Sequence, residues 1–166
     1  STSYMADGYA RAGGRIGVCM TVPGPGFTNA MAGLATAYAC SSPLLSITGQ
    51  IHSTTIGAGY GMLHEIKEQS SLVGSVTKWQ GIAARPEQVP ALVRQAVQQL
   101  RSGRPQPVGI EIAHDVLSGS ADIELIEPPA AFDGRLPADS AQVEAAAALL
   151  SSARFPVIHA GGGVLA

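Results

Sequence analysis

The chain has 166 residues, of which 46% are hydrophobic and 13% are charged, and its formal net charge is −2. Soluble domains that stand alone usually carry roughly 25% charged residues, so we expect another domain or subunit to cover much of this surface. The small negative charge, without a basic cluster and with 5% aromatic residues, argues against nucleic acid as the main partner.

Neither a membrane span nor a disulfide framework is expected. The apolar runs fall short of the ~20 residues that cross a bilayer, and the chain opens without a signal peptide. Cys19 and Cys40 lack the spacing of metal ligands, and we expect both to be buried, reduced thiols. These features favour a cytoplasmic protein with no membrane partner.

Apolar strands and amphipathic helices alternate through residues 1–116. The expected strands lie at 15–20, 43–48, 76–82 and 107–112, and the expected helices lie at 3–11, 28–40, 64–72 and 86–100. This alternation predicts an α/β fold with a parallel sheet and helices on both of its faces.

The rest of the chain predicts a linker and the start of a second domain. Residues 117–138 are rich in Pro and Asp, as is typical of an interdomain linker. A helix at 140–151, an apolar strand at 155–160 and the turn Gly161–Gly163 would then open a second α/β domain, which begins at residue 139. Residue 1 is not Met and the last residues follow a turn that usually leads into a helix, so we expect the chain to be part of a longer protein.

The segment Thr21–Asn29 (TVPGPGFTN) joins the first strand to the next helix. Proline fixes φ, and glycine lets another molecule approach the backbone closely. Thr28 or Asn29 can cap the free amides of the helix. Ligands of α/β sheets bind at the carboxyl ends of strands, so this turn is a candidate binding site. The residues alone leave a plain helix-entry turn as the alternative.

Six stretches carry recognisable motifs. They are ADGYARAGG (6–14), PGPGFTN (23–29), ATAYACSSPLLSITGQ (35–50), VTKW (76–79), SGRPQPVGIEI (102–112) and ARFPVIHAGGGV (153–164). In order and spacing, across nearly the whole chain, they resemble the thiamine-diphosphate-dependent enzymes of the acetolactate synthase and 2-oxo-acid decarboxylase superfamily.

That resemblance implies a domain plan and a chemistry. Residues 1–116 would be most of a domain that binds the pyrimidine ring of the cofactor, residues 117–138 a linker, and residues 139–166 the beginning of a central domain. The family's diphosphate- and metal-binding domain, with its Gly-Asp-Gly motif, has no counterpart in this sequence. The implied cofactors are thiamine diphosphate and Mg²⁺, with FAD in some members.

The implied substrate is a 2-oxo acid that is decarboxylated or joined to a second carbonyl compound. Active sites of the family lie between two subunits, which implies a homodimer or a homotetramer. The resemblance also assigns site residues. Gly24, Pro25, Gly26 and Asn29 match the wall beside the pyrimidine ring, and Gln50 ends the family's TGQ motif near the cofactor or the partner subunit. A hydrogen bond from Gln50 to nearby backbone that fixes the loop is the alternative. No metal ligand is expected in this chain.

The loop at 57–65 (GAGYGMLHE) departs from acetolactate synthase. That enzyme has Asp-Ala-Phe-Gln-Glu here, with Phe and Gln facing the substrate; the Gln position is Met62 without a gap and His64 with a shift. We take His64 as the candidate catalytic residue, because an imidazole moves protons near neutral pH. The family's catalytic glutamate would lie just before Ser1, so we expect this chain by itself to be inactive.

Other readings stay open. His52 has a weaker claim than His64 to an active-site role, and His114 and His159 are expected to be structural. A non-catalytic α/β module that binds a nucleotide or a protein partner is the main alternative. A dinucleotide-dependent oxidoreductase is disfavoured, because Gly24-Pro25-Gly26 lacks the third glycine and the downstream acidic residue of that fingerprint.

Overall fold

The computed structural model describes residues 2–124 and 137–165. The chain forms two compact units, Ser1–Phe132 and Asp133–Ala166. Of the predicted linker at 117–138, residues 125–136 lie outside the described part of the chain.

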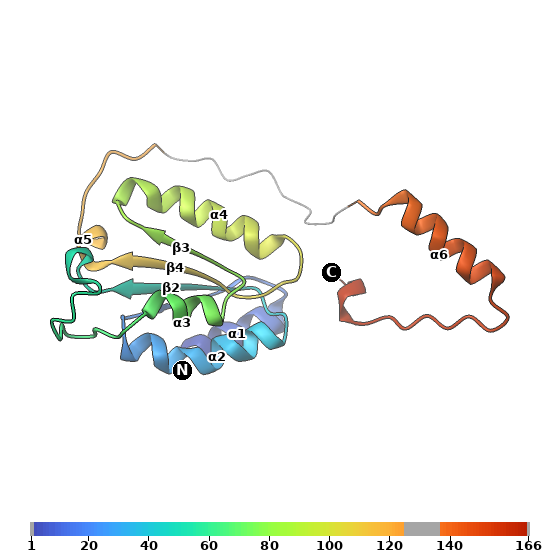
Figure 1. Ribbon diagram of the computed structural model, residues 1–166, viewed down its shortest axis with the longest axis horizontal. Coiled ribbons are helices and arrows are strands. Elements are labelled where there is room, and N and C mark those ends of the chain that lie inside the picture. Colours follow the sequence, from blue (N-terminus) through green and yellow to red (C-terminus); the bar gives the residue numbers. More distant parts are fainter. Residues whose placement is uncertain (1, 125–136, 166) are drawn as a thin grey trace. The chain divides into compact units, whose positions relative to one another are not determined.

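The first unit is built on a four-stranded sheet in the order β1-β2-β4-β3 (Figure 1). Its strands are β1 (Gly17–Thr21), β2 (Leu44–Gln50), β3 (Trp79–Ala83) and β4 (Val108–Ala113). Its helices are α1 (Thr2–Gly13), α2 (Pro25–Ala39), α3 (Gln69–Ser75), α4 (Val89–Arg101) and α5 (His114–Leu117), with 3-10 turns at Ser53–Thr55 and Pro86–Gln88. All the strand pairs are parallel, which confirms the predicted α/β fold.

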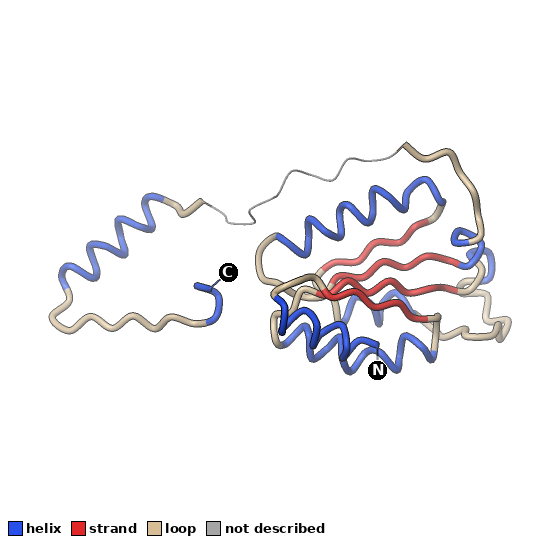
Figure 2. The backbone as a smooth tube through the Cα atoms, turned by 180° about the vertical axis from the view of Figure 1, so that it is seen from behind, coloured by secondary structure: helices blue, strands red, loops and turns tan. Residues whose placement is uncertain are grey.

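Helices cover both faces of the sheet, as predicted, but unequally. Helices α1, α2 and α3 lie on one face and α4 lies on the other, as both views of the backbone show (Figures 1 and 2). On the first face, Phe27 and Leu34 of α2 are fully buried. On the second face, α4 packs over β2, β3 and β4, and its Leu100 is buried in the core. Residues Val18 and Met20 of β1 point to this second face and stay more than half exposed, at 53% and 66%.

Helix α2 begins at Pro25, earlier than the predicted start at residue 28. Proline suits the first helical position because its missing N–H needs no partner there, and Gly24 precedes it as the N-cap residue. No side chain caps the helix, which corrects the capping role expected for Thr28 and Asn29. The Thr28 hydroxyl instead donates to the Pro25 carbonyl oxygen at 3.1 Å.

Helix α3 begins at Gln69, whereas the sequence pattern predicts a helix from residue 64. His64 and Glu68 have φ values of 69° and 58°, and a right-handed helix cannot contain such left-handed residues. The segment before Gln69 is therefore an irregular loop, and His64 lies on that loop rather than on a helix.

The two cysteines differ in environment. Cys19 is buried in β1 as expected, and burial raises the pKa of its thiol while a hydrogen bond with Ser46 partly opposes that shift. Cys40 is exposed, which corrects the expectation that it is buried. It follows directly after the end of α2 at Ala39, where the chain leaves the helix on the protein surface.

The second unit contains α6 (Ser140–Ser152) and a 3-10 turn at Gly162–Leu165. The Asp139 side chain caps α6 by accepting a hydrogen bond from the Ala141 amide at 2.9 Å. The strand predicted at 155–160 does not form. A strand needs a partner to satisfy its main-chain groups, and residues 137–165 contain no strand with which it could pair.

Candidate functional site

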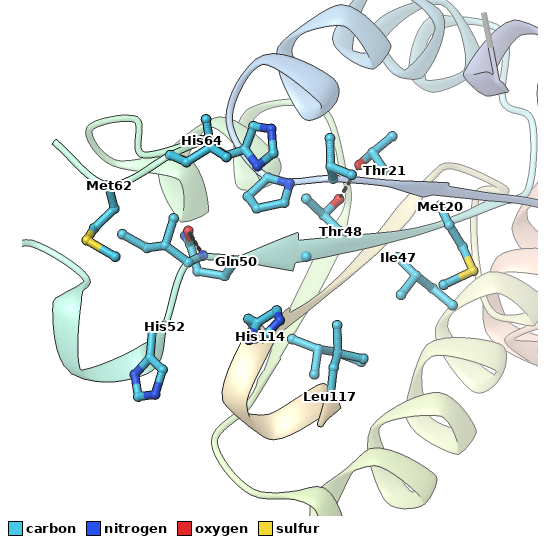
Figure 3. Close-up of a pocket in the computed structure, with 16 residues that line it drawn as sticks. Met20, Thr21, Ile47, Thr48, Gln50, His52, Met62, His64, His114 and Leu117 are labelled. Atoms are coloured by element: carbon cyan, nitrogen blue, oxygen red, sulfur yellow. Dashed lines mark hydrogen bonds between the residues drawn. The ribbon is translucent and has the colours of Figure 1, made fainter. Parts of the chain in front are cut away.

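A pocket of about 760 Å³ lies at the carboxyl ends of β1, β2 and β4 (Figure 3). Parallel strands bring their carboxyl ends to one edge of the sheet, so loops from distant parts of the sequence meet there. The lining residues are Met20, Thr21, Val22, Pro23, Ile47, Thr48, Gly49, Gln50, Ile51, His52, Met62, Leu63, His64, Ile112, His114 and Leu117.

Most of this lining is apolar, with a few polar groups. The polar side chains are those of Thr21, Thr48, Gln50, His52, His64 and His114. Among the described lining residues there is no Lys, Arg, Asp or Glu. A pocket of this size and character suits an aromatic or apolar ligand that is oriented by a small number of hydrogen bonds.

Two of the predicted site residues, Gln50 and His64, line this pocket. Gln50 is 9% exposed, and its Oε1 accepts a hydrogen bond from the Ile51 amide at 2.8 Å, which fixes the orientation of the side-chain amide. His52 and His114 line the pocket as well, although His114 was expected to be structural. It reaches the pocket because it stands at the turn from β4 into α5, at the carboxyl end of the strand.

The other predicted site residues, Gly24, Pro25, Gly26 and Asn29, are not among the residues that line the pocket. Of the motif at 23–29, it is Pro23 that lines the pocket. Pro25 and Asn29 are exposed on the first turns of α2. Contact of these four residues with a cofactor stays a prediction.

Glycine at position 24 is required by packing within the chain. Its φ is +59°, and a Cβ atom there would lie 2.2 Å from the His64 carbonyl oxygen. The close approach that the sequence suggests for a ligand is therefore made, at this residue, by the main chain of His64. His64 therefore lies directly against the turn after β1, and residues 62–64 and that turn both line the pocket.

Asp115 accepts two hydrogen bonds from Ser53, which follows His52 in the loop after β2. Its Oδ2 accepts a hydrogen bond from Ser53 Oγ at 2.6 Å, and its Oδ1 accepts one from the Ser53 amide at 2.9 Å. These two hydrogen bonds, with a smaller effect from nearby His52, lower the pKa of Asp115 to about 2. His52 Nδ1 lies 4.0 Å from Asp115 Oδ1. Sequence reasoning missed this contact, because nothing in the sequence pairs residues 53 and 115.

A buried polar cluster also escaped the sequence analysis. Gln69 and Glu111 are 2% and 1% exposed, and Gln69 Nε2 donates to Glu111 Oε2 at 2.9 Å. The available signal was the charged Glu111 inside the apolar run PVGIEI at 107–112. A charged residue in a strand that is buried along its whole length requires a specific partner.

Within residues 2–124 and 137–165, no group of three or more His, Cys, Asp or Glu side chains is placed to hold a metal ion. In the same part of the chain, none of the helices has the length and apolar character needed to cross a bilayer.

Comparison with known proteins bears on the identity of this fold and pocket. Residues 1–72 match the family described as "Thiamine pyrophosphate enzyme, N-terminal TPP binding domain", thiamine pyrophosphate being another name for thiamine diphosphate. The match ends within α3 and includes β1, β2 and most of the residues that line the pocket.

Individual relatives extend the similarity over almost the whole chain. The chain is 42% identical over 163 residues to a probable 2-ketoarginine decarboxylase of Pseudomonas aeruginosa, which covers 98% of this chain and 29% of the relative. It is 40% identical over 170 residues to a probable acetolactate synthase large subunit of Methanocaldococcus jannaschii, with 99% and 28% covered. It is 31% identical over 169 residues to the acetolactate synthase isozyme 3 large subunit of Escherichia coli, with 98% and 28% covered.

The chain thus spans less than a third of the length of these relatives. The ordered motifs, the parallel α/β sheet and the family match at residues 1–72 agree with one another. The chain is therefore similar over nearly its whole length to thiamine pyrophosphate enzymes, and its residues 1–72 match their N-terminal TPP binding domain.

Proposed function

We propose that the whole protein is a thiamine-diphosphate- and Mg²⁺-dependent enzyme that acts on a 2-oxo acid, and that this chain forms the pyrimidine side of its active site. The observation that carries the proposal is the pocket at the carboxyl ends of β1, β2 and β4, with Gln50 and His64 in its wall. This is the edge of a parallel α/β sheet at which ligands bind.

The lining fits the pyrimidine part of the cofactor. An aromatic ring needs apolar walls and a few oriented polar groups, and the pocket offers Pro23, Ile51 and Met62 beside the fixed amide of Gln50. When bound, thiamine diphosphate supplies the electron sink for cleavage next to a carbonyl group, and the protein supplies binding and orientation. The apolar side chains of this wall would exclude water from the reacting atoms.

The diphosphate and the Mg²⁺ ion need other residues. Binding of a diphosphate calls for cationic side chains or a metal ion, and the described lining has no Lys or Arg. The described residues also lack a metal-holding cluster. We therefore assign this part of cofactor binding to the rest of the whole protein.

His64 is the residue of this chain that we propose for proton transfer. It lies on the loop before α3, with a φ of 69°, and its side chain lines the pocket. The described lining residues include no Asp or Glu. An imidazole in the wall of the pocket could donate a proton to a bound substrate or accept one from it. The substrate of the probable 2-ketoarginine decarboxylase and the reaction of the acetolactate synthases both lie within this proposed class, either simple decarboxylation or carboligation.

A homodimer or homotetramer is part of the proposal. The low charged fraction of 13% supports it, as do the exposed apolar side chains of Tyr4, Met5 and Tyr9 on α1. Sedimentation of the whole protein tests this point, and a monomer at micromolar concentration would contradict it. The domain boundaries at 116 and 139, FAD at the central domain and the cytoplasmic location stay predictions from the sequence.

Calorimetric titration of the whole protein with thiamine diphosphate is the main experiment. We expect saturable binding that requires Mg²⁺, and CO₂ release when pyruvate is added as a first substrate probe. Absence of binding with Mg²⁺ present would overturn the proposal and favour a non-catalytic binding module.

Substitution of His64 tests the assigned residue. His64→Asn keeps a residue that tolerates the left-handed backbone, so the fold should persist. We expect it to lower kcat by about 100-fold, as loss of a general acid or base does. His159→Asn, a matched change in the second unit, should leave kcat unchanged. Equal kcat values for the two variants would remove His64 from the mechanism.

A further inference from the structure

Gln69 is the first residue of α3, and its side chain is almost completely buried. Its amide makes three hydrogen bonds to three different parts of the first unit. Oε1 accepts from the Gly24 amide at 2.7 Å, and Nε2 donates to the Gly49 carbonyl oxygen at 2.9 Å and to Glu111 Oε2 at 2.9 Å. One side chain therefore joins the turn after β1 to the end of β2 and to the middle of β4.

One of these partners lies in the wall of the pocket, and a second lies next to it in the chain. Gly49 lines the pocket, and Gly24 follows Pro23, which also lines it. The Gly24 amide lies at the N-cap position of α2, outside the helical hydrogen-bond pattern, so the Gln69 oxygen is the acceptor that satisfies it. The turn after β1 is thus tied to β2 through a side chain from a third segment.

Glu111 favours the same orientation of the Gln69 amide as the main-chain groups of Gly24 and Gly49. Carboxylate oxygens accept hydrogen bonds, so Nε2 of Gln69 must point toward Glu111 and Oε1 must point toward Gly24. A flipped amide would set its NH₂ group against the Gly24 N–H and its oxygen against the carboxylate. Both contacts would be repulsive and buried, which is costly. The Glu111 side chain does not line this pocket, and its hydrogen bond to Gln69 connects it to the turn after β1 and the end of β2.

We propose that Gln69 and Glu111 are positioning residues, which fix the turn at 22–24 and the end of β2 in the geometry that the cofactor pocket requires. The inference rests on the proposed function for its link to thiamine diphosphate. It does not rest on that function for its local effect on the backbone.

The experiment uses variants of the whole protein and two measurements. The variants are Gln69→Leu, Glu111→Leu, Glu111→Gln and, as the control, Gln106→Leu. Gln106 is also a buried glutamine, at 8% exposure, and its Nε2 donates to the Tyr38 carbonyl oxygen at 3.2 Å. It lies just before β4 begins and does not line the pocket. The measurements are thiamine diphosphate titration with Mg²⁺, and main-chain hydrogen exchange without cofactor in peptides covering residues 22–26 and 49–53.

We expect Gln69→Leu and Glu111→Leu to weaken thiamine diphosphate binding by about 10-fold or more, because small displacements of binding groups have large effects. Exchange should accelerate in both peptides. Glu111→Gln should bind like the unchanged protein, since its amide oxygen can accept the same hydrogen bond from Gln69. The control Gln106→Leu should change neither measurement in these peptides, even if it lowers stability overall.

Binding and exchange unchanged in Gln69→Leu, or changed equally in Gln106→Leu, would overturn the proposal. If Gln69→Leu does not fold, Gln69→Asn replaces it, because the shorter amide cannot reach all three partners. If the unchanged protein binds no thiamine diphosphate, the proposed function fails, and the exchange measurements alone decide whether Gln69 and Glu111 fix the turn.

Discussion

Gly24 is the residue at which backbone conformation and packing both require glycine. For any other residue the left-handed φ of +59° costs ~1–2 kcal/mol, and a Cβ would also collide with the His64 carbonyl oxygen. We expect Gly24→Ala to lower the free energy of unfolding by about 3 kcal/mol or more, measured by urea denaturation. Gly59→Ala is the control, with φ +70° and nothing within 4 Å. It should cost only ~1 kcal/mol; equal costs would show that the contact with His64 is unimportant.

Asp115 gives a pH-dependent prediction at the same scale. Its pKa falls from 3.8 to about 2 in the folded protein, mainly through the hydrogen bonds from Ser53. A carboxyl group with a lowered pKa stabilises the fold fully above pH 4, and this contribution is lost as the pH falls toward 2. Asp115→Asn should therefore lower the melting temperature at pH 6, and the difference should shrink between pH 4 and pH 2. A pH-independent difference, or an equal one for exposed Asp122→Asn, would contradict this.

Sequence reasoning predicted some of the residues that line the pocket. Gln50, at the end of the TGQ motif, and His64, in the loop at 57–65, line it, whereas Gly24, Pro25, Gly26 and Asn29 do not. Ser53 and Asp115, by contrast, are joined across 62 positions, and Gln69 reaches Glu111 across 42. Such contacts depend on the three-dimensional path of the loops, and no periodicity in a single sequence records that path.

At the scale of elements, the apolar pattern predicted the existence of the strands and helices of the first unit better than the residues at which the helices begin. Helix α4 combines Pro86 before it with apolar residues at helical spacing, and it forms close to where the pattern predicts. The starts of α2 and α3 were misplaced, because they depend on Gly24, His64 and Glu68 in left-handed conformation. A side chain does not reveal by its identity alone that its residue has positive φ.

Helix α4 supplies the prediction for this scale, because no other helix longer than a turn covers its face of the described sheet. Leu100 is 3% exposed and packs in the cluster with Ile110 and Ile112. Leu100→Ala should therefore cost about 2–5 kcal/mol of unfolding free energy, through lost burial and the cavity left behind. Leu63→Ala makes the same chemical change at an 83% exposed side chain and should cost below ~0.5 kcal/mol. Urea denaturation of both variants measures the difference, and similar costs would disprove the role of α4 in the core.

At the scale of the whole molecule, the strand predicted at 155–160 shows where a local pattern is insufficient. Its residues have the apolar character of a buried strand, yet Phe155 and Val157 are 81% and 88% exposed. A parallel strand is stable only beside other strands, and the described second unit provides none. The apolar composition of a segment thus shows that it can form a strand, whereas the presence of a neighbouring strand determines whether the strand forms.

The charges of the pocket give a prediction about the division of labour between this chain and the whole protein. The described lining has three histidines but no Lys or Arg, and no metal-holding cluster exists in the described residues. Little in this wall can therefore distinguish thiamine diphosphate from thiamine, which has the same rings without the diphosphate. We expect the 166-residue chain to bind the two compounds with Kd values within about 3-fold of each other.

The whole protein should behave differently in the same calorimetric titration. With Mg²⁺ present, it should bind thiamine diphosphate about 100-fold or more tightly than thiamine, and chelation of the metal should remove most of that preference. A strong preference for thiamine diphosphate in the 166-residue chain would instead place the diphosphate site within it. That result would contradict the proposal that this chain binds the pyrimidine side and the rest of the protein binds the diphosphate. A charged binding site would then lie at the same edge of the sheet as the apolar wall.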